Sequence, residues 1–472
     1  MKSVNLYYGV KDRPGFLKTL VFAFQQVLAI LAATIVVPVI INGSKEGLAM
    51  GAQMSQSAAL FGAGIGTLVY LCFTKFKSPV FLGSSFAFIG SMCAAIGGAA
   101  SMAVGYLGLI IGAVMAGLVY VIIAIVVKFA GVKWIDKIMP ASVIGPTVAI
   151  IGLSLSGNAI GDLFKGGVLV EGASVASPYL ALVCGLVTLA TVIVCSVYGK
   201  KMLKMIPFII GILAGYIVAS IFTVIGLIAD VPALQIINFS LFKDMAWLPE
   251  FTFVEGIDAF SQLDNFGAYL LTLFIAYVPV AFVVFAEHLA DHKNISSIIG
   301  TDLTKEPGLH RTLLGDGVGS MVGAFFGGCP NTTYGESVGC VAISGNASVI
   351  TIVFAAIICV VASFFAPFVT LLATIPSCVM GGVCVALYGF IAVSGLKMIQ
   401  KVDLNDNANL FTVSVILIAG VGGMTLTFGS VTITSIACAL ILGVLANLIS
   451  AKARKTNAQT ETEENKDENT AA

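Results

Sequence analysis

The stretch Met139-Pro140-Ala141-Ser142-Val143-Ile144-Gly145 occurs a second time, with changes, as Ile375-Pro376-Ser377-Cys378-Val379-Met380-Gly381. Each copy opens a long apolar run. Internal repeats of this kind are typical of transporters that are built from two similar halves. The fold therefore depends on how many membrane spans separate the two copies.

The composition excludes a soluble protein. Of the 472 residues, 58% are hydrophobic and only 10% are charged, whereas a soluble domain carries about 25% charged residues. The first apolar run extends from Phe16 to Ile41. It is too long for the core of a signal peptide, and no small-residue cleavage site follows it. We therefore expect this run to be the first membrane span.

At about 20 apolar residues per span, the chain contains fourteen candidate spans. The third and the tenth are the weakest as helices, because Pro79 and Gly83 interrupt one, and Pro330 and Gly335 interrupt the other. The expected spans are 17–40, 56–73, 79–97, 103–128, 139–156, 178–198, 206–228, 267–290, 312–328, 331–345, 347–371, 375–396, 409–422 and 432–450.

The Lys and Arg residues support an even count of spans. Cytoplasmic loops carry the excess of positive charge. With the amino terminus inside, the outside segments hold only Lys45, Lys165 and Lys243 of the 24 Lys and Arg residues. We therefore expect a multi-pass protein of the cytoplasmic membrane with both termini in the cytoplasm.

The two copies of the repeated stretch open the fifth and the twelfth span. Because these are seven spans apart, the copies enter the membrane from opposite sides, which predicts two inverted seven-span repeats. Such folds place the substrate where the interrupted segments of the two halves meet. The same spacing pairs the interrupted third span with the interrupted tenth, so a site is expected there.

Two acidic residues fall in this region. Glu287 follows the apolar run Leu270–Ala286, and Glu336 ends the stretch Pro330-Asn331-Thr332-Thr333-Tyr334-Gly335-Glu336. A carboxylate in lipid costs about 2.5–3.5 kcal/mol at a helix centre, so intramembrane acids are rare and usually functional. We interpret the pair as holding a small polar substrate at mid-membrane.

The interrupted segments offer backbone groups as well. Residues 330–334 are unfavourable for a helix, and non-helical backbone is tolerated at membrane depth only where it is buried or lines a cavity. Its free N–H and C=O groups suit the edge of a flat heterocycle. The segment Leu82–Phe88 can supply the same groups from the other half, and Phe86 adds an aromatic ring.

Other polar residues nearby have more than one interpretation. Glu287 and Asp291 share a helix face. A metal site that uses Asp291, His288 or His292 is disfavoured, because a further nearby ligand is missing and the stretch lies at the predicted cytoplasmic boundary. Asp316 is expected to hydrogen-bond to the interrupted tenth span rather than to the substrate.

The ninth span repeats glycine every fourth residue, at Gly315, Gly319, Gly323 and Gly327. A stripe of small residues lets two helices approach closely, so we expect this face to pack on another helix rather than to meet lipid.

Four motifs together resemble the nucleobase–ascorbate transporter family, and most of all its branch of proton-coupled uracil permeases. They are Phe-Leu-Gly-Ser-Ser-Phe-Ala-Phe-Ile at 81–89, Ala-Glu-His at 286–288, Pro-Gly-Leu-His-Arg at 307–311 and Pro-Asn-Thr-Thr-Tyr-Gly-Glu-Ser at 330–337. The resemblance extends from about residue 10 to 450.

This resemblance implies an all-α polytopic membrane protein with fourteen transmembrane segments in two inverted repeats, and short β-strands in spans 3 and 10. It implies a core domain of spans 1–4 and 8–11, a gate domain of spans 5–7 and 12–14, and often a homodimer. The corresponding ranges are 1–128 and 267–371 for the core, 129–228 and 372–450 for the gate, 229–266 for an external loop and 451–472 for a disordered cytoplasmic tail.

The resemblance also implies roles for individual residues. Glu287 and Glu336 match the two carboxylates that bind the substrate, while Phe86 and Gly335 match positions whose backbone groups contact the pyrimidine. The chain departs from the family's pattern at Gln26, Asp291 and Ser337, where many relatives have His, His and Asn.

These observations predict a secondary active transporter that imports uracil with protons by alternating access. Burial disfavours a charged carboxylate, so Glu287 is the candidate proton carrier, with Asp291 as a relay to the cytoplasm. The alternative for Asp291 is a surface residue that pairs with Lys293 or caps a loop. Glu336, where xanthine and urate carriers tend to have Gln, favours uracil.

No catalytic residue, metal, nucleic-acid partner or cofactor other than protons is expected; the partners are uracil, membrane lipid and a second copy of the chain. The first rival function is a xanthine or broader nucleobase permease. The second is an anion exchanger or channel of the same architecture, against which two acids in the pocket argue. A membrane-embedded enzyme is disfavoured because no nucleophile–base pair or metal cluster is visible.

Overall fold

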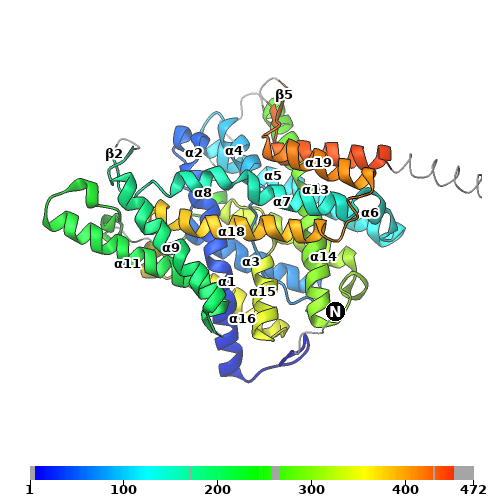
Figure 1. The fold of residues 1–472 in the computed structure, drawn as a ribbon, viewed down its shortest axis with the longest axis horizontal. Helices are drawn as coiled ribbons and strands as arrows, with labels where there is room; N and C mark the ends of the chain where they lie inside the picture. Colours follow the sequence, from blue (N-terminus) through cyan, green and yellow to red (C-terminus); the bar gives the residue numbers. More distant parts are fainter. Residues whose placement is uncertain are drawn as a thin grey trace, which may run out of the picture.

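The computed structural model describes residues 6–450 except 171–172, 201, 244, 246, 258, 260–265 and 429–430. It is predominantly helical (Figure 1). The predicted cytoplasmic tail, 451–472, and parts of the predicted external loop lie outside the described residues.

Eight described helices are long and apolar enough to cross a membrane, or nine if α16 and α17 form one bent span. The chain is therefore a multi-pass membrane protein, while the count of fourteen spans and their inverted arrangement stay predictions. The long helices are α1 (Phe16–Gly43), α3 (Gln56–Phe73), α5 (Met102–Ala130), α7 with α8 (Ala141–Asp162), α9 (Pro178–Tyr198), α11 (Pro207–Ile228), α13 (Phe266–Ile299) and α18 (Ser377–Ile399).

The shorter elements connect or complete these helices. Two helices, α16 and α17, enclose an angle of 85°. The helical elements are α2 (Lys45–Met50), α4 (Ile89–Gly97), α6 (Lys133–Ile138), α10 (Met202–Met205), α12 (Thr252–Ile257), α14 (Leu309–Gly327), α15 (Gly335–Ser344), α16 (Val349–Ala362), α17 (Ala366–Ala373), α19 (Asn407–Val421), a last helix Ser435–Ser450, and the single turns η1 (Pro232–Leu234), η2 (Phe239–Lys243) and η4 (Thr304–Gly308).

The strands form three short antiparallel pairs. Two of these pairs, β2 (Leu169–Val170) with β3 (Ala173–Ser174) and β5 (Leu426–Phe428) with β6 (Val431–Ile433), connect elements that are neighbours in sequence. The third pair is different, because it joins segments that are far apart in the chain.

This third pair is made by the two proline-interrupted segments. Strand β1 (Leu82–Ser84) precedes α4, and β4 (Asn331–Thr333) precedes α15. The strands run antiparallel, with Leu82 opposite Thr333 and Ser84 opposite Asn331. Each interrupted segment is thus a short strand followed by a half-length helix, and the pairing satisfies backbone groups that lipid could not.

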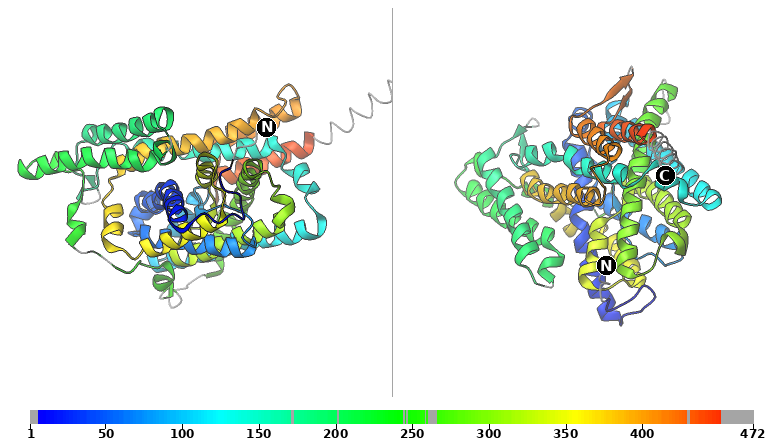
Figure 2. Two further views of the ribbon diagram at one scale, coloured as in Figure 1. Left: turned by 90° about the horizontal axis from the view of Figure 1, so that it is seen from below. Right: turned by 45° about the vertical axis from the view of Figure 1, so that its right-hand side comes forward.

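The helices pack in two groups. In the first, α14 packs on α3 and α5, α16 packs on α1 and α3, and α13 packs on α5. In the second, α18 packs on α7 and α9, α11 packs on α9, and α19 packs on α7. Seen from below, the groups form two layers, and α1 runs down the view of Figure 1 while α7 and α18 cross it (Figures 1 and 2).

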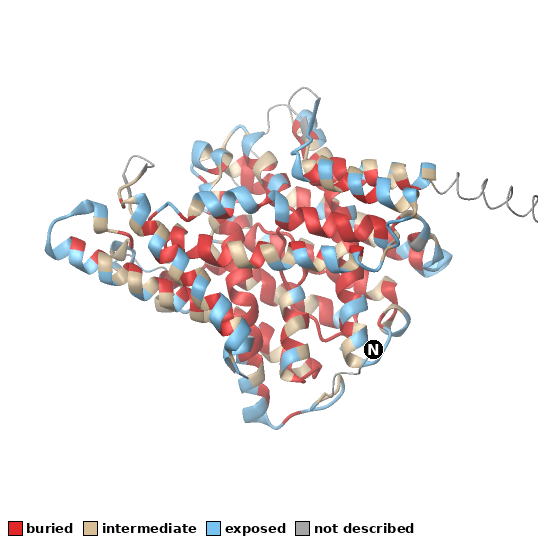
Figure 3. Cartoon of the chain, in the orientation of Figure 1, coloured by how far each residue is buried: buried red, intermediate tan, exposed pale blue. Residues whose placement is uncertain are grey.

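Buried residues gather in the middle of the view, and exposed residues lie mostly toward its edges (Figure 3). The outer faces of α9 and α11 expose large apolar side chains such as Val194 and Ile221, which is expected of helices that face lipid. The groups also contact each other directly, since the ring of Phe86 meets the ring of Tyr388 of α18 at a centroid distance of 5.6 Å.

The glycine stripe of α14 packs on α3, as predicted. A Cβ atom at Gly319 would lie 2.7 Å from the carbonyl oxygen of Gly66, which is too close for any side chain. Gly315 and Gly327 approach α3 residues in the same way. The stripe thus allows close contact between helices and does not face lipid.

Helix α13 is longer than the predicted eighth span. The prediction placed this end at residue 290, but the helix continues to Ile299. Its last turns include His288, Asp291 and His292, whose side chains are all buried. They are covered by protein rather than by lipid, so polar residues continue the helix where the apolar sequence pattern stops.

Candidate functional site

A cavity of about 460 Å³ lies between the two groups of helices. Glu287, Asp291 and Ala290 of α13 form one wall, and Gly335 and Glu336 of α15 form another. The other lining residues are Ala29, Phe86, Val148, Ser196, Lys204, Pro207, Phe208, Asn294, Thr332, Tyr334, Val338, Gly339, Cys340, Ile343, Phe390, Ile391 and Ser394.

The cavity thus brings together every residue that the sequence singled out for the site. Phe86, Glu287, Asp291, Gly335 and Glu336 all line it, although they are separated by up to half of the chain. The roles assigned to them stay predictions. The remaining wall, from α7, α11 and α18, is largely apolar.

The paired strands position the amino-terminal end of α15 and Phe86, which precedes α4, at this cavity. The backbone N–H of Ser85 donates to the carbonyl oxygen of Pro330 at 2.9 Å, and that of Tyr334 donates to the carbonyl oxygen of Phe81 at 3.2 Å. Helix α15 begins directly after Tyr334, and α4 begins four residues after Ser85. The first N–H groups of a helix have no partner within the helix, so they suit acceptor atoms of a ligand.

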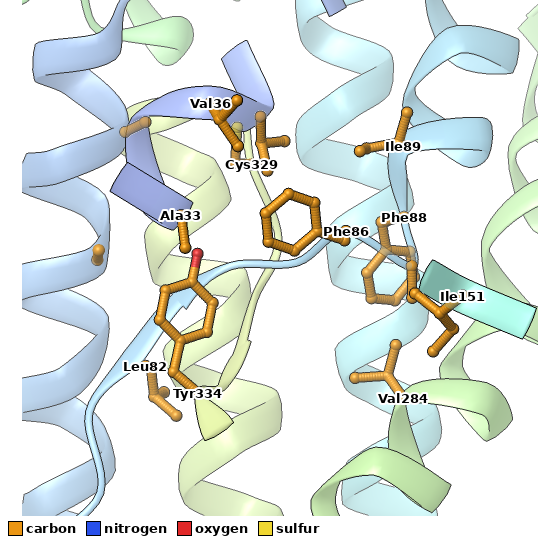
Figure 4. Close-up of a cluster of buried hydrophobic side chains, with 14 of the residues drawn as sticks. Ala33, Val36, Leu82, Phe86, Phe88, Ile89, Ile151, Val284, Cys329 and Tyr334 are labelled. Atoms are coloured by element: carbon orange, nitrogen blue, oxygen red, sulfur yellow. The ribbon is translucent and has the colours of Figure 1, made fainter. Parts of the chain in front are cut away.

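Gly83 is needed for the packing of Tyr334. A Cβ atom at Gly83 would overlap the Tyr334 ring. The Tyr334 hydroxyl donates to the carbonyl oxygen of Ser84 at 2.8 Å. Figure 4 shows Tyr334 with Leu82 and Phe86 in this cluster. Tyr334 thus holds the end of β1 in place, and Phe86 follows two residues later.

Two of the departures from the family's pattern compensate each other. The side-chain amide of Gln26 donates to the Ser337 hydroxyl, which also accepts from the backbone N–H of Phe81 at 3.1 Å. Ser337 therefore ties α1 and the segment before β1 to the start of α15. Sequence reasoning noted Gln26 and Ser337 separately but did not find their contact, because they lie far apart in the chain.

Asp291 is not a surface residue. Only 8% of it is exposed, and its carboxylate accepts a hydrogen bond from the Thr333 hydroxyl at 2.9 Å. The alternative in which Asp291 pairs with Lys293 or caps a loop is therefore wrong. Its place on the cavity wall, one helical turn from Glu287, is compatible with the predicted relay.

Asp316 has a different partner from the one predicted. Its carboxylate lies 2.7 Å from Nδ1 of His288, and Nε2 of His288 lies 3.0 Å from the Thr312 hydroxyl. The expectation that Asp316 binds the tenth segment is therefore wrong. Two signals in the sequence pointed to this pair: Asp316 is acidic in a span without Lys or Arg, and His288 directly follows Glu287.

A second histidine continues this buried network. The rings of His288 and His292 stack at a centroid distance of 3.9 Å. Nε2 of His292 lies 2.8 Å from the Tyr70 hydroxyl, which in turn lies 2.6 Å from the Ser78 hydroxyl. The network joins α13 to α3 and α14 behind the cavity wall.

The electrostatics of the site are dominated by acids. Among the described residues, no Lys or Arg forms an ion pair with Glu287, Asp291, Asp316 or Glu336. Lys204 lines the cavity but is exposed to solvent. No cluster of His, Cys, Asp or Glu suited to a metal ion occurs in the part of the chain that the structure describes.

Comparison with known proteins identifies the family. The model of the Permease family matches residues 17–429. The chain belongs to this family. The uracil permease of Bacillus subtilis (strain 168) is 36% identical over 465 residues, 97% of this chain and 98% of the relative. That of Bacillus caldolyticus is 36% identical and covers 93% and 94%, and that of Escherichia coli (strain K12) is 33% identical and covers 93% of each.

Solved structures show the same fold. The transmembrane domain of the cyanobacterial bicarbonate transporter BicA superposes with a TM-score of 0.57 at 18% identity, covering 93% of this chain and 99% of that one. The murine anion transporter Slc26a9, in its inward-facing state, superposes with a TM-score of 0.62 at 13% identity, covering 94% and 69%. At such low identity the likeness concerns the fold alone.

The resemblance seen in the sequence motifs is confirmed, since the family matches over nearly the whole chain. The relatives are permeases, so this protein is a membrane transporter of a small molecule and not an enzyme.

Proposed function

We propose that the protein imports uracil together with protons by alternating access. The observation that carries the proposal is the cavity wall, where Glu287 and Glu336 lie beside Phe86 and Gly335 between two groups of helices. Relatives named uracil permeases, 33–36% identical along most of the chain, support the choice of substrate.

The chemistry of the wall matches that of a pyrimidine edge. Uracil offers two ring N–H donors and two carbonyl acceptors. Glu336 accepts from ring N–H, while a protonated Glu287 donates to a carbonyl oxygen. The backbone N–H groups at the start of α15 and near Phe86 complete the contacts, and the Phe86 ring packs on the heterocycle.

Proton coupling is assigned to Glu287 with Asp291. Uracil is neutral, so coupling needs a group whose protonation changes with occupancy of the site. Glu287 takes the proton when substrate binds, and Asp291 passes it toward the solvent-exposed side of the cavity at Asn294 and Lys204. Lys204 belongs to a segment predicted to be cytoplasmic, so we assign this conformation to the inward-open state.

Alternating access requires one group of helices to move against the other. We assign the predicted core ranges 1–128 and 267–371 to the first group of helices, and the predicted gate ranges 129–228 and 372–450 to the second. We propose that they rotate as two bodies about the cavity. A homodimer in the cytoplasmic membrane, with both termini in the cytoplasm, is part of the same proposal.

The decisive experiment is uptake of radiolabelled uracil into proteoliposomes, with and without an inward-directed proton gradient. We expect uptake to rise with the proton gradient. The same uptake with and without the gradient would refute the coupling. Competition with thymine, xanthine and hypoxanthine separates a uracil carrier from a broader nucleobase permease. Bicarbonate and sulfate test the anion exchanger, which the acidic wall disfavours.

A further inference from the structure

His288 and Asp316 form a buried pair outside the substrate cavity. His288 follows Glu287 on α13, but it contacts α14 and does not line the cavity. His288 is 0% exposed and Asp316 is 1% exposed. The 2.7 Å between Nδ1 of His288 and Oδ2 of Asp316 is the length of a charge-assisted hydrogen bond.

The Thr312 hydroxyl lies next to Nε2, the other ring nitrogen of His288. The Thr312 hydroxyl donates its only hydrogen to the carbonyl oxygen of Leu309, at 3.0 Å. With its hydrogen placed there, the hydroxyl accepts from Nε2 of His288, also at 3.0 Å. In this arrangement Nε2 carries a hydrogen.

The hydrogen on Nε2 determines whether a proton must lie between Nδ1 of His288 and Oδ2 of Asp316. A neutral imidazole with its hydrogen on Nε2 has none on Nδ1, and an ionised Asp316 has none on Oδ2, so two acceptors would face each other at 2.7 Å. The contact requires one additional proton. It resides on Oδ2 as a carboxylic acid, or on Nδ1 as an imidazolium beside a carboxylate.

We propose that the His288–Asp316 pair is a proton-binding site, separate from the acids that line the cavity, and that it holds one proton at neutral pH. In both forms the pair has no net charge. Shifting the proton between Oδ2 and Nδ1 leaves the count of protons and charges unchanged.

The surroundings of Asp316 support a neutral pair. Its other oxygen, Oδ1, has no hydrogen-bond partner among the described residues, and the same holds for the hydroxyl of Tyr120. Both residues line a small cavity of about 10 Å³ together with Ser320 and Asn331. A pair with a net negative charge would leave a buried charged oxygen without a donor, which is costly.

The titratable groups around the pair do not stabilise a net negative charge on it. Those on the neighbouring elements are Glu287, Asp291 and His292 on α13, Tyr120 on α5, Tyr70 on α3 and Glu336 on α15. Glu287 and Asp291 repel a negative charge on Asp316. A second positive charge on His292, stacked on His288, would oppose an imidazolium there.

His292 provides an internal reference. Its Nδ1 lies 2.8 Å from the carbonyl oxygen of His288, which can only accept, so Nδ1 carries the hydrogen. In neutral His292 the unprotonated Nε2 then accepts from the Tyr70 hydroxyl. The two stacked histidines are thus expected to have opposite tautomers.

Solid-state NMR of ¹⁵N-histidine-labelled protein in lipid vesicles, without substrate, tests this directly. The chain has only three histidines, and His310→Asn and His292→Gln variants assign the signals. We expect Nε2 of His288 to be protonated at pH 7 and Nε2 of His292 to be unprotonated. An unprotonated Nε2 on His288 would overturn the proposal, whatever the protein transports.

Matched variants show whether Thr312 fixes the proton. Thr312→Val removes the acceptor of the Nε2 hydrogen and should shift the Nε2 signal of His288, whereas Thr312→Ser keeps the hydroxyl and should keep the wild-type spectrum. Asp316→Asn should leave Nδ1 unprotonated, accepting from the amide. A Thr312→Ser protein with an unprotonated Nε2 would contradict the assignment even if Thr312→Val fails to fold.

Discussion

Replacing Glu336 by Gln tests the substrate site most directly. Glu336 is the second residue of α15 and lines the cavity, and among the described residues no other side chain donates a hydrogen bond to it. Its carboxylate is therefore available to ring N–H groups of the substrate. The glutamine side chain has nearly the same shape, but one acceptor oxygen becomes an NH2 donor.

The strength of the lost hydrogen bond sets the expected loss of uracil affinity. A hydrogen bond to a charged acceptor contributes about 1.5–3 kcal/mol. In Glu336→Gln, one oxygen still accepts, but the NH2 group faces a ring N–H and leaves it unpaired. We therefore expect uracil binding to weaken by at least ~10-fold, which is about 1.4 kcal/mol, and by up to ~150-fold, which is about 3 kcal/mol.

Equilibrium binding of radiolabelled uracil to the purified protein in detergent measures this change. Removing a negative charge from the first turn of α15 also costs about 0.3–1 kcal/mol of helix stability. Thermal unfolding of the variant separates this loss from the effect on binding. A variant with a lower Tm but unchanged affinity would show only the loss of helix stability.

Asp291→Asn is the matched control, because it makes the same carboxylate-to-amide change on the wall of the same cavity. Asp291 already accepts from the Thr333 hydroxyl, and the amide oxygen of Asn can continue to accept there. Binding should stay within ~3-fold, under about 1 kcal/mol. Wild-type affinity in Glu336→Gln would remove Glu336 from the substrate site.

Further variants test the relay, the helix packing and the start of α15. Asp291→Asn should slow uptake driven by a proton gradient, whereas an unaltered rate and pH profile would refute the relay. Gly319→Leu should lower Tm and folded yield, because overpacking costs about 1–3 kcal/mol, while Gly389→Leu, where a Cβ atom meets nothing within 4 Å, should not. Ser337→Ala leaves the N–H of Phe81 and the Gln26 amide without an acceptor, so Tm should fall further than in Gln26→Leu; equal losses would contradict this.

The cavity wall could be predicted because its chemistry is unusual for a membrane. Acids are rare in apolar runs, so Glu287 and Glu336 stand out without any structure. The interrupted segments stand out for the same reason, since Pro330 and Gly335 oppose a helix where lipid requires one. Both signals are local, so each can be recognised from a short stretch of sequence.

The partners of the acids could not be predicted in this way. Asp291 is buried, and its hydrogen-bond donor Thr333 lies in a strand 42 residues away in sequence. Hydropathy along the chain reports Asp291 and Lys293 as polar residues, so it ends the predicted span before the helix itself ends. The contact of His288 with Asp316 likewise depends on how closely α14 packs, which the sequence indicates only through its glycines.

The four intramembrane acids differ in what they bind, and this difference assigns their tasks. Asp316 has His288 and Asp291 has Thr333, so one carboxylate oxygen of each already has a hydrogen-bond partner. Glu287 and Glu336 receive no hydrogen bond from another side chain among the described residues, yet both line the cavity. Since a partly buried carboxylate without a donor is costly, these two acids gain most from a ligand with N–H groups or from a proton. Substrate binding should therefore depend on Glu287 and Glu336 far more than on Asp291 or Asp316.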